Sequence, residues 1–316
     1  MILAGLLLLW LGVGFYLFHR ACARTKEHPW LDREALAKTD FGKYSDSIER
    51  TWDYLKTHNA KDVWIRSRDG FMLHGLWLEA KDPVGTMLLV HGYHSTYLVD
   101  FSGAVASYHS QGLNLLIPDQ RCHGKSQGRY TTFGVKESED MVSWLEYMNR
   151  ELWSGPVVLS GMSMGASTVM YMADKSLPGN VRGMIADCGF TSPAAIIGKV
   201  FTDVTHLPPV PWIWSAQIFA RILAGFSLWE KDAANVMRHA PYPVLLAHGK
   251  ADDFVPCEMA RKIYENCSGD TELLLVDGAG HGVSYLKDKL SYTKAVRKLL
   301  RKAFGSPYEL RNDQKL

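Results

Sequence analysis

The sequence predicts an α/β protein with a mostly parallel sheet of about eight strands and helices on both faces. Short apolar runs alternate with amphipathic segments over most of the 316 residues, the pattern of parallel strands joined by crossover helices. An Asp-Gly pair, Asp69-Gly70, separates the first two runs and predicts an antiparallel hairpin at the start of the sheet. A G-x-S-x-G pentapeptide, Gly161–Gly165, lies between an apolar run and a helix-like segment. These three observations predict one large α/β domain.

The composition argues against several classes of protein. Lys and Arg number 35 against 33 Asp and Glu, a net charge of +2, so no nucleic-acid partner is expected. The five cysteines include no C-x-x-C pair, and an odd number in a long chain argues against a disulfide framework. With 47% hydrophobic residues, the chain can bury a large core.

Residues 1–24 are expected to form a transmembrane anchor. The stretch from Ile2 to Phe18 carries no charge and is near the lower length limit for a membrane-spanning helix. A cleaved signal peptide is the main alternative, but no Lys or Arg precedes the run and no clear A-x-A site ends it; a buried helix is a second. Because Arg20, Arg24 and Lys26 follow the run, we expect a single-pass protein of the cell membrane whose remaining chain is cytoplasmic.

Residues 25–60 are expected to connect this anchor to a domain at 61–316. Within the segment, 43–58 predicts a surface helix that lies on the domain. Its apolar residues at helical spacing are Ile48, Trp52 and Leu55.

The domain itself is expected to begin with hairpin strands at 63–65 and 71–78. Further strands are expected at 86–90, 113–118, 157–160, 181–186, 244–247 and 272–276. Helices are expected at 97–111, 136–150, 164–174, 256–267 and 289–304. The segment 190–242 departs from this alternation of strands and helices, because it is apolar, is interrupted by prolines and is too long for a simple crossover. We interpret it as a helical cap over the edge of the sheet.

The pentapeptide Gly161–Gly165 lies where a strand turns sharply into a helix. Such a turn strains the backbone of its central serine and needs small residues two positions before and after it. The Ser163 hydroxyl is then expected at the carboxyl edge of the sheet, beside the N–H groups of a helix N-terminus. Ser163 is therefore the candidate nucleophile.

The loop after the strand at 86–90 supplies a candidate oxyanion hole. A glycine between His91 and Tyr93 allows a sharp turn, so that the Tyr93 N–H can point into the site and pair with the N–H of Met164. A metal at His91 and His94 is not expected, because these two histidines have no third ligand nearby. His91 is expected to be a hydrogen-bonded structural histidine.

Residues 119–126, which follow the strand at 113–118, are expected to form a tight structural loop. Charged and small side chains dominate this segment. Cys122 lies within it but has no obvious base of its own, so it is not a candidate nucleophile.

Two later strands lead to a candidate acid and a candidate base. The segment 248–256 contains Asp252 and Asp253; either carboxylate could orient a histidine, and spacing alone does not separate them. The last strand ends in a glycine-rich loop around His281. The chain order Ser, Asp, His is one in which catalytic triads occur, so His281 is the candidate base.

These residues resemble the alpha/beta-hydrolase superfamily over roughly residues 60–305. The motifs are HGYHS (91–95), DQRCHGKS (119–126), GMSMG (161–165), HGKADDFVP (248–256) and GAGHG (278–282). Together they are similar to a bacterial lineage of membrane-anchored hydrolases grouped with serine aminopeptidase-like sequences. The resemblance implies an alpha/beta-hydrolase fold and, in H-G-x-x-D-x-x-V-P, assigns the triad acid to Asp252. Cys122 replaces a glycine of that family's D-x-R-G-H-G-x-S loop.

The resemblance and the residues together predict a serine hydrolase that cleaves a carboxylic ester through an acyl-enzyme. Ser163 would attack, His281 would take its proton and Asp252 would orient His281. The aromatic and aliphatic cap favours a small-molecule or lipid-like acyl substrate. The alternatives are an acyl-thioesterase or lipase acting on membrane-derived acyl groups, or a serine aminopeptidase. An inactive membrane-tethered scaffold is disfavoured because all three triad residues are present, and no cofactor or metal is expected.

Overall fold

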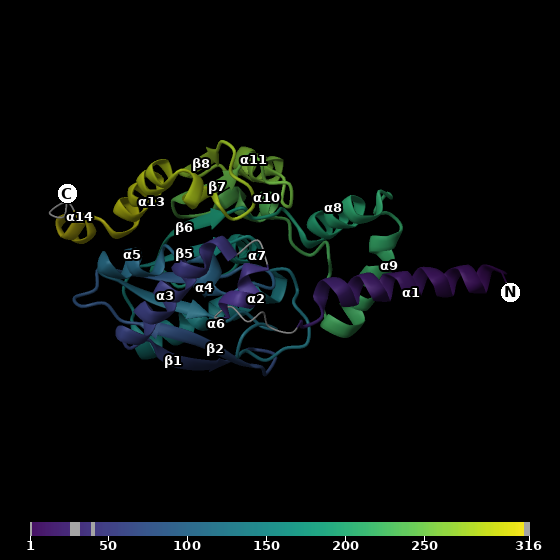
Figure 1. The fold of residues 1–316 in the computed structure, drawn as a ribbon, viewed down its shortest axis with the longest axis horizontal. Coiled ribbons are helices and arrows are strands. Elements are labelled where there is room, and N and C mark those ends of the chain that lie inside the picture. The colour runs from purple at the N-terminus through teal and green to yellow at the C-terminus, as the bar shows by residue number, and fades with distance from the viewer. Residues whose placement is uncertain (1, 26–31, 39–41, 313–316) are drawn as a thin grey trace.

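The sheet is mostly parallel, as predicted. The computed structural model describes residues 2–25, 32–38 and 42–312. Within them, eight strands form one sheet in the order β1-β2-β4-β3-β5-β6-β7-β8 (Figure 1). Only β2 runs antiparallel to its neighbours, β1 and β4, and the other neighbouring pairs are parallel. The Asp-Gly hairpin and the α/β class are therefore both confirmed.

The central strands are buried on both faces because helices cover both sides of the sheet. Their ladders continue slightly further than the apolar runs, so that β5 and β6 still pair at Met162 and Asp187. The strands are β1 (Lys61–Arg66), β2 (Met72–Leu78), β3 (Gly85–Val90), β4 (Leu113–Pro118), β5 (Val157–Met162), β6 (Val181–Asp187), β7 (Val244–Gly249) and β8 (Thr271–Val276).

Side-chain alternation along the strands divides the interior into two cores. On β3, Leu88 and Val90 belong to one core, whereas Met87 and Leu89 belong to the other. The first core packs against α6 (Val135–Tyr147), α7 (Met164–Met170) and α11 (Cys257–Asn266). The second packs against α3 (Ser45–Thr57), α4 (Tyr97–Asp100), α5 (Val105–Ser110) and α13 (Lys289–Phe304). The central strands therefore contribute to both cores with a period of two residues, whereas β1 contributes only to the first.

The remaining helical elements are short. The helix expected at 97–111 is instead two separate helices, α4 and α5, with a turn at residues 101–104 between them. Gly103 lies in this turn, where a Cβ would lie 2.8 Å from the Tyr285 ring. The others are α2 (Arg33–Ala37), α12 (Ser284–Lys287), α14 (Ser306–Asn312) and the turns η1 (Gly42–Tyr44), η2 (Met148–Leu152) and η3 (Tyr171–Asp174).

The segment that connects the first helix to the domain contains the expected surface helix. Ile48 and Leu55 of α3 are buried in the second core, so this helix lies on the domain. Residues 26–31 and 39–41 of the expected segment, Lys26 among them, lie outside the described residues, as do residues 313–316 of the expected domain.

The helical cap consists of α8 (Pro193–Thr205), α9 (Trp212–Phe219) and η4 (Ala220–Ala224). These elements share a third apolar cluster with the end of the first helix and with the start of α7. The last part of the expected insertion behaves differently. Helix α10 (Ala233–Val236) and η5 (Met237–His239) pack into the first core, so residues 233–242 lie against the sheet.

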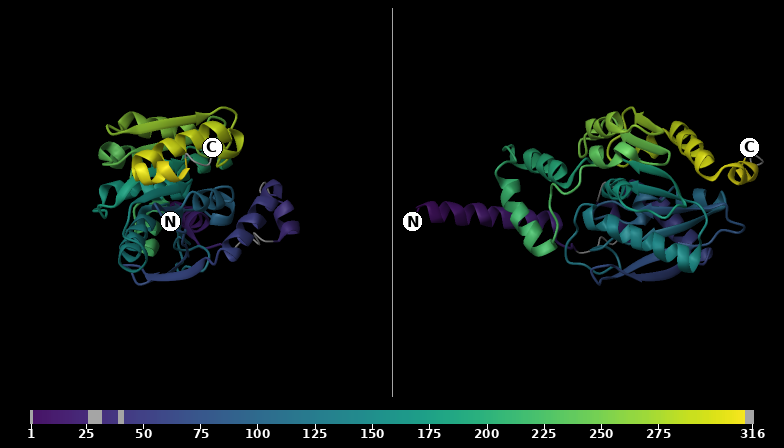
Figure 2. Two further views of the ribbon diagram at one scale, coloured as in Figure 1. Left: turned by 90° about the vertical axis from the view of Figure 1, so that its left-hand side faces the viewer. Right: turned by 180° about the vertical axis from the view of Figure 1, so that it is seen from behind.

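Helix α1 (Ile2–Cys22) is the one described helix long and apolar enough to cross a membrane. Its amino-terminal end projects from the molecule, beyond α8 and α9 (Figures 1 and 2). From Trp10 onward the helix packs on the cap: the Trp10 indole donates to the Pro211 carbonyl at 3.2 Å, and the Phe15 and Phe219 ring centroids lie 5.4 Å apart. Helix α1 is therefore integrated with the cap over much of its length.

The contact between α1 and α9 predicts a substitution with a matched control. Gly14→Ala is expected to destabilise the packing by about 1–3 kcal/mol, because the added Cβ would lie 2.4 Å from the Ser215 Cβ. Gly12→Ala adds a Cβ that meets nothing within 4 Å, and alanine favours the helix. Thermal unfolding in detergent should therefore show a lower Tm for Gly14→Ala only. Equal Tm values for the two variants would contradict this packing.

Candidate active site

Ser163 occupies the sharp turn between β5 and α7. Its φ of 53° and ψ of −116° lie in a region that residues other than glycine rarely adopt. The Ser163 N–H donates to the carbonyl of Asp187 on the neighbouring strand at 2.8 Å, and this hydrogen bond helps to hold the strained backbone. The turn aims the hydroxyl out of the sheet at its carboxyl edge.

The two glycines of the pentapeptide are required by close backbone contacts. A Cβ on Gly165 would lie 1.9 Å from the carbonyl oxygen of Val90, on β3. A Cβ on Gly161 would lie 2.2 Å from the carbonyl oxygen of Gly165. Both distances are too short for any side chain, so the turn between β5 and α7 can form only with glycine at these positions.

His281 stands between Ser163 and Asp252. Its Nε2 lies 2.9 Å from the Ser163 Oγ, and its Nδ1 lies 2.8 Å from the Asp252 Oδ2. The loop after β8 reaches this position through Gly278 and Gly282, whose φ angles are 63° and 67°. The structure thus brings together three residues that the sequence selected from three separate loops.

The two neighbouring aspartates occupy different environments. Asp252 is buried, and its Oδ1 accepts the N–H groups of Phe254 and Val255 at 3.0 and 2.8 Å. Burial alone would raise its pKa, but hydrogen bonds from His248 and His281 hold that pKa well below its usual range. Asp253 is exposed. Of the two, it is Asp252 whose carboxylate hydrogen-bonds to His281.

His248 is a site residue to which the sequence reasoning assigned no role. It is fully buried, and its Nε2 lies 3.2 Å from the Asp252 Oδ2 and 2.8 Å from the Val255 carbonyl. Because the carbonyl can only accept, Nε2 must carry the proton. His248 therefore fixes the carboxylate from the side opposite the loop N–H groups. Its place at the start of HGKADDFVP was the available signal.

The candidate oxyanion loop lies directly beside the serine. A Cβ on Gly92 would lie 3.2 Å from the Ser163 Cβ, so the following residue, Tyr93, is next to the site. Met164 is the first residue of α7, and an N–H at that position has no acceptor within its own helix. Both predicted donors therefore belong to segments that meet at Ser163.

Asp100 fixes this loop, and the sequence offered no signal for it. Its carboxylate accepts the Gly92 N–H at 2.5 Å and the Ser95 hydroxyl at 2.7 Å. Burial raises the pKa of Asp100. Tyr93 is also tied down at its other end, because its phenol donates to the Ala21 carbonyl of α1 at 2.8 Å.

His91 and Cys122 have the surroundings of structural residues. His91 is buried with both ring nitrogens near backbone groups: Nδ1 lies 2.8 Å from the Gly92 carbonyl, and Nε2 accepts the Gln120 N–H at 3.1 Å. Cys122 has a φ of 68°, which explains the physical preference for glycine there. Burial raises the pKa of the Cys122 thiol to about 12, so this thiol is not a ready nucleophile.

One group of possible metal ligands occurs among the described residues. The ligand atoms of Cys188, Asp252 and His281 lie within 4.8 Å of one another. Asp252 and His281 already hydrogen-bond to each other, and burial raises the pKa of the Cys188 thiol well above its usual value. This donor set is poorly suited to a metal, which binds the thiolate.

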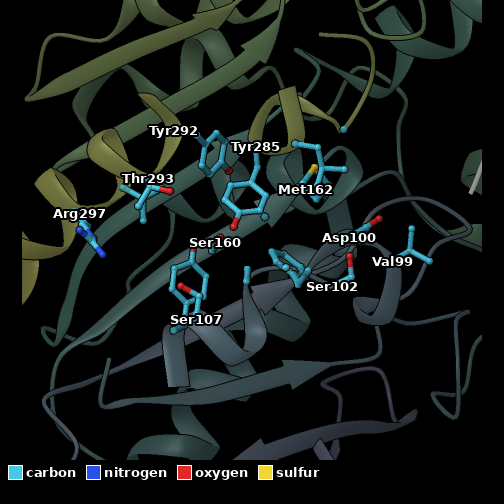
Figure 3. Close-up of a pocket in the computed structure, with 18 of the residues that line it drawn as sticks. Val99, Asp100, Ser102, Ser107, Ser160, Met162, Tyr285, Tyr292, Thr293 and Arg297 are labelled. Carbon is cyan, nitrogen blue, oxygen red and sulfur yellow. The ribbon is translucent and has the colours of Figure 1, made fainter. Parts of the chain in front are cut away.

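A small cavity lies behind the serine turn, between β5 and the helices α5 and α13 (Figure 3). Its volume of about 80 Å³ has room for a few water molecules only. Met162 and Gly282, neighbours of Ser163 and His281 in the chain, line the cavity together with Tyr285. The cavity is therefore too small to hold an acyl chain.

The buried carboxyl of Asp187 predicts a pH dependence of stability. Burial raises its pKa to about 6, from 3.8, so between these values the folded state binds a proton that the unfolded chain has lost. Its stabilising effect is therefore full below about pH 4 and is lost as the pH rises through about 6. Asp187→Asn should gain about 1–3 kcal/mol relative to wild type between pH 4 and pH 7. Urea unfolding of both proteins measures this; a difference independent of pH would contradict it.

A model for the alpha/beta hydrolase family matches residues 87–289. Among relatives in sequence, the uncharacterized protein YqkD of Bacillus subtilis is 28% identical over 239 residues, 75% of this chain and 77% of its own. The uncharacterized protein YfhR of Escherichia coli is 22% identical over 228 residues, 71% of this chain and 74% of its own.

Solved structures with the same fold include two esterases. The Pyrococcus furiosus esterase Pf2001 has a TM-score of 0.62 and 23% identity, and the match covers 79% of this chain and 94% of that one. The Exiguobacterium antarcticum esterase has a TM-score of 0.58 and 18% identity, with 76% and 100% covered. At these identities the likeness concerns the fold.

Proposed function

The chain belongs to the alpha/beta hydrolase family, and we propose that it is a serine hydrolase that cleaves carboxylic esters through an acyl-enzyme. The observation that carries this proposal is the continuous chain of contacts from Ser163 through His281 to Asp252, at 2.9 and 2.8 Å. Nucleophile, base and orienting carboxylate within such distances are the requirement for activating a serine. The esterases of the same fold support the choice of substrate bond.

The hydrogen bonds around His281 define its role. Asp252 is ionised, since its pKa is held low, so its carboxylate accepts a hydrogen bond from the Nδ1–H of His281. The proton therefore stays on Nδ1, and Nε2 of the neutral imidazole is free to accept the Ser163 proton. As Ser163 Oγ attacks the ester carbonyl, His281 becomes an imidazolium that the Asp252 charge stabilises. The imidazolium then protonates the departing alcohol, and water attacks the acyl-enzyme by the same route.

The N–H groups of Tyr93 and Met164 stabilise the oxyanion that forms during both steps. In comparable sites one such donor contributes about 3–4 kcal/mol to the transition state. Asp100 acts through this loop as a positioning residue, because its bonds to Gly92 and Ser95 hold the loop on both sides of Tyr93. Preorganisation of this kind means that the loop need not rearrange when charge develops.

We further propose that helix α1 attaches the protein to a membrane, with the hydrolase domain on the cytoplasmic side. Its length and composition suit a membrane, and Arg20 and Arg24 at its carboxyl end agree with that orientation. Its packing argues for a retained helix over a cleaved signal. Phe18 and Cys22 are buried, and the Cys22 carbonyl accepts the Thr131 N–H at 2.8 Å. An acyl-thioesterase or lipase acting on membrane-derived acyl groups is the second candidate, favoured by this helix.

The nucleophile can be tested with a fluorophosphonate probe, which labels activated serines. Ser163→Ala should abolish labelling and lower ester hydrolysis at least about a thousandfold. Ser160→Ala is the matched control, because Ser160 is also buried on β5 but has no place in the proposed mechanism. Gel fluorescence and initial rates measure both effects. Persistent labelling of Ser163→Ala would show that another residue is the nucleophile.

The bond that is cleaved can be tested with three sets of substrates. Full-length protein in detergent should show its highest kcat/KM for p-nitrophenyl esters, because an apolar cap suits an uncharged acyl group better than a charged peptide. Acyl-thioesters and aminoacyl arylamides are the comparison substrates, with the Ser163→Ala variant as the blank for each. A higher kcat/KM for thioesters would favour the second candidate, and a clear preference for arylamides would contradict ester hydrolysis and indicate an aminopeptidase.

A further inference from the structure

Helix α1 and the cap both expose large apolar side chains. Most exposed large apolar side chains of the described residues lie on one or the other. From Ile2 to Leu9, every residue of α1 is exposed. We use the name cap tip for the large apolar side chains of the cap segment 190–242 that are at least 41% exposed, namely Val204, Leu207, Val210, Trp214, Ile222, Leu223 and Trp229. Exposed apolar area of this extent marks an interaction surface in a soluble domain.

The length of α1 that is free of the cap is the decisive observation. The contacts of α1 with the cap begin at Trp10, whose indole donates to Pro211, and continue through Gly14 against Ser215. The free part, Ile2–Leu9, is about 12 Å long at 1.5 Å per residue. The hydrocarbon core of a bilayer is about 30 Å thick. A bilayer that takes up more of α1 than this free part must also take up the cap residues beside Trp10, among them Pro211, Trp214 and Trp229.

The side chains at the junction suit the boundary between lipid and water. A groove between α1 and the cap is lined by Trp10, Trp214, Trp229 and Arg221. The rings of Trp214 and Trp229 stack at 4.6 Å. Tryptophan is enriched at the membrane interface, and an exposed arginine beside it can pair with lipid phosphate while its stem stays in the apolar region.

We propose that the cap tip inserts into a phospholipid bilayer beside α1, so that the cap faces lipid and the serine site lies at the membrane surface. One hydrogen bond links α1 to the proposed site. The Tyr93 phenol donates to the carbonyl of Ala21, near the end of α1, at 2.8 Å, and Tyr93 belongs to the proposed oxyanion loop. The occupant of the cap tip is the bilayer. It follows, on the basis of the proposed ester hydrolysis, that esters dissolved in the bilayer are the preferred substrates.

Insertion can be measured without reference to activity. The experiment uses full-length protein with Cys267→Ser, because Cys267 is the one cysteine that is not buried. A nitroxide label is attached to Leu207→Cys or Ile222→Cys in this background. The labelled protein is reconstituted in vesicles of phosphatidylcholine and phosphatidylglycerol. Both labels should collide several-fold more with oxygen, relative to a water-soluble nickel chelate, than a control label at Leu290. Leu290 is 81% exposed and lies on α13, away from α1 (Figure 1).

Nickel-accessible labels at both cap-tip positions would overturn the proposal. So would labels shielded from both reagents together with cap-to-cap cross-links, since these would indicate a second copy of the chain as the occupant.

The consequence for substrates has its own test. The double variant Ile222→Asp/Leu223→Asp should hydrolyse p-nitrophenyl palmitate in the same vesicles about tenfold more slowly than wild type, because a carboxylate in lipid is costly. Its rate on water-soluble p-nitrophenyl acetate should not change, which also shows that it folds. Leu290→Asp is the control and should retain both rates. Equal rates of the double variant and wild type on palmitate would refute the membrane-resident substrate. Absence of any hydrolysis by wild type would refute ester hydrolysis and leave the labelling result standing.

Discussion

The close approach of the β5–α7 turn to β3 is the constraint on which the proposed site depends. With Gly165 almost in contact with the Val90 carbonyl, the start of α7 is pressed against the end of β3, and Ser163 is left with a positive φ. The same approach brings the loop after β3 beside the serine. One tight backbone contact therefore positions the hydroxyl, the first N–H of α7 and the candidate oxyanion loop together.

Around this rigid turn, buried polar groups hold the more flexible loops. Asp252 accepts hydrogen bonds from two backbone N–H groups and two histidines, so its carboxylate has no freedom to rotate. Asp100 accepts hydrogen bonds from the Gly92 N–H and the Ser95 hydroxyl, and so holds the loop on both sides of Tyr93. Buried carboxylates are costly unless they are fully hydrogen-bonded. In this protein the hydrogen bonds of Asp252 and Asp100 each hold one loop in place beside Ser163.

Much of this arrangement could be predicted because its causes are local in the chain. Strands alternate in side-chain direction, and the serine turn needs glycine at two fixed positions, so both leave a periodic or spaced signal. Asp100 left no signal of this kind, and His248 left only its place at the start of HGKADDFVP, which does not state its role. A single buried carboxylate or histidine looks the same in sequence whether it orients a loop or only fills space. The break between α4 and α5 was also not predicted, and the Tyr285 ring beside it at Gly103 comes from a distant part of the chain.

Sequence patterns were sufficient to predict the α/β sheet, the strained serine turn and the set of residues from which a triad can be proposed. Period-two burial and the steric demand for glycine act over a few residues, and this is why both leave a pattern in the sequence. In contrast, the packing of α1 on the cap, its contact with Tyr93 and the place of residues 233–242 in the first core became evident only in the folded protein. The Trp10–Pro211 hydrogen bond joins residues 201 positions apart. Contacts at such separations arise from the shape of the folded chain, and no local pattern records them.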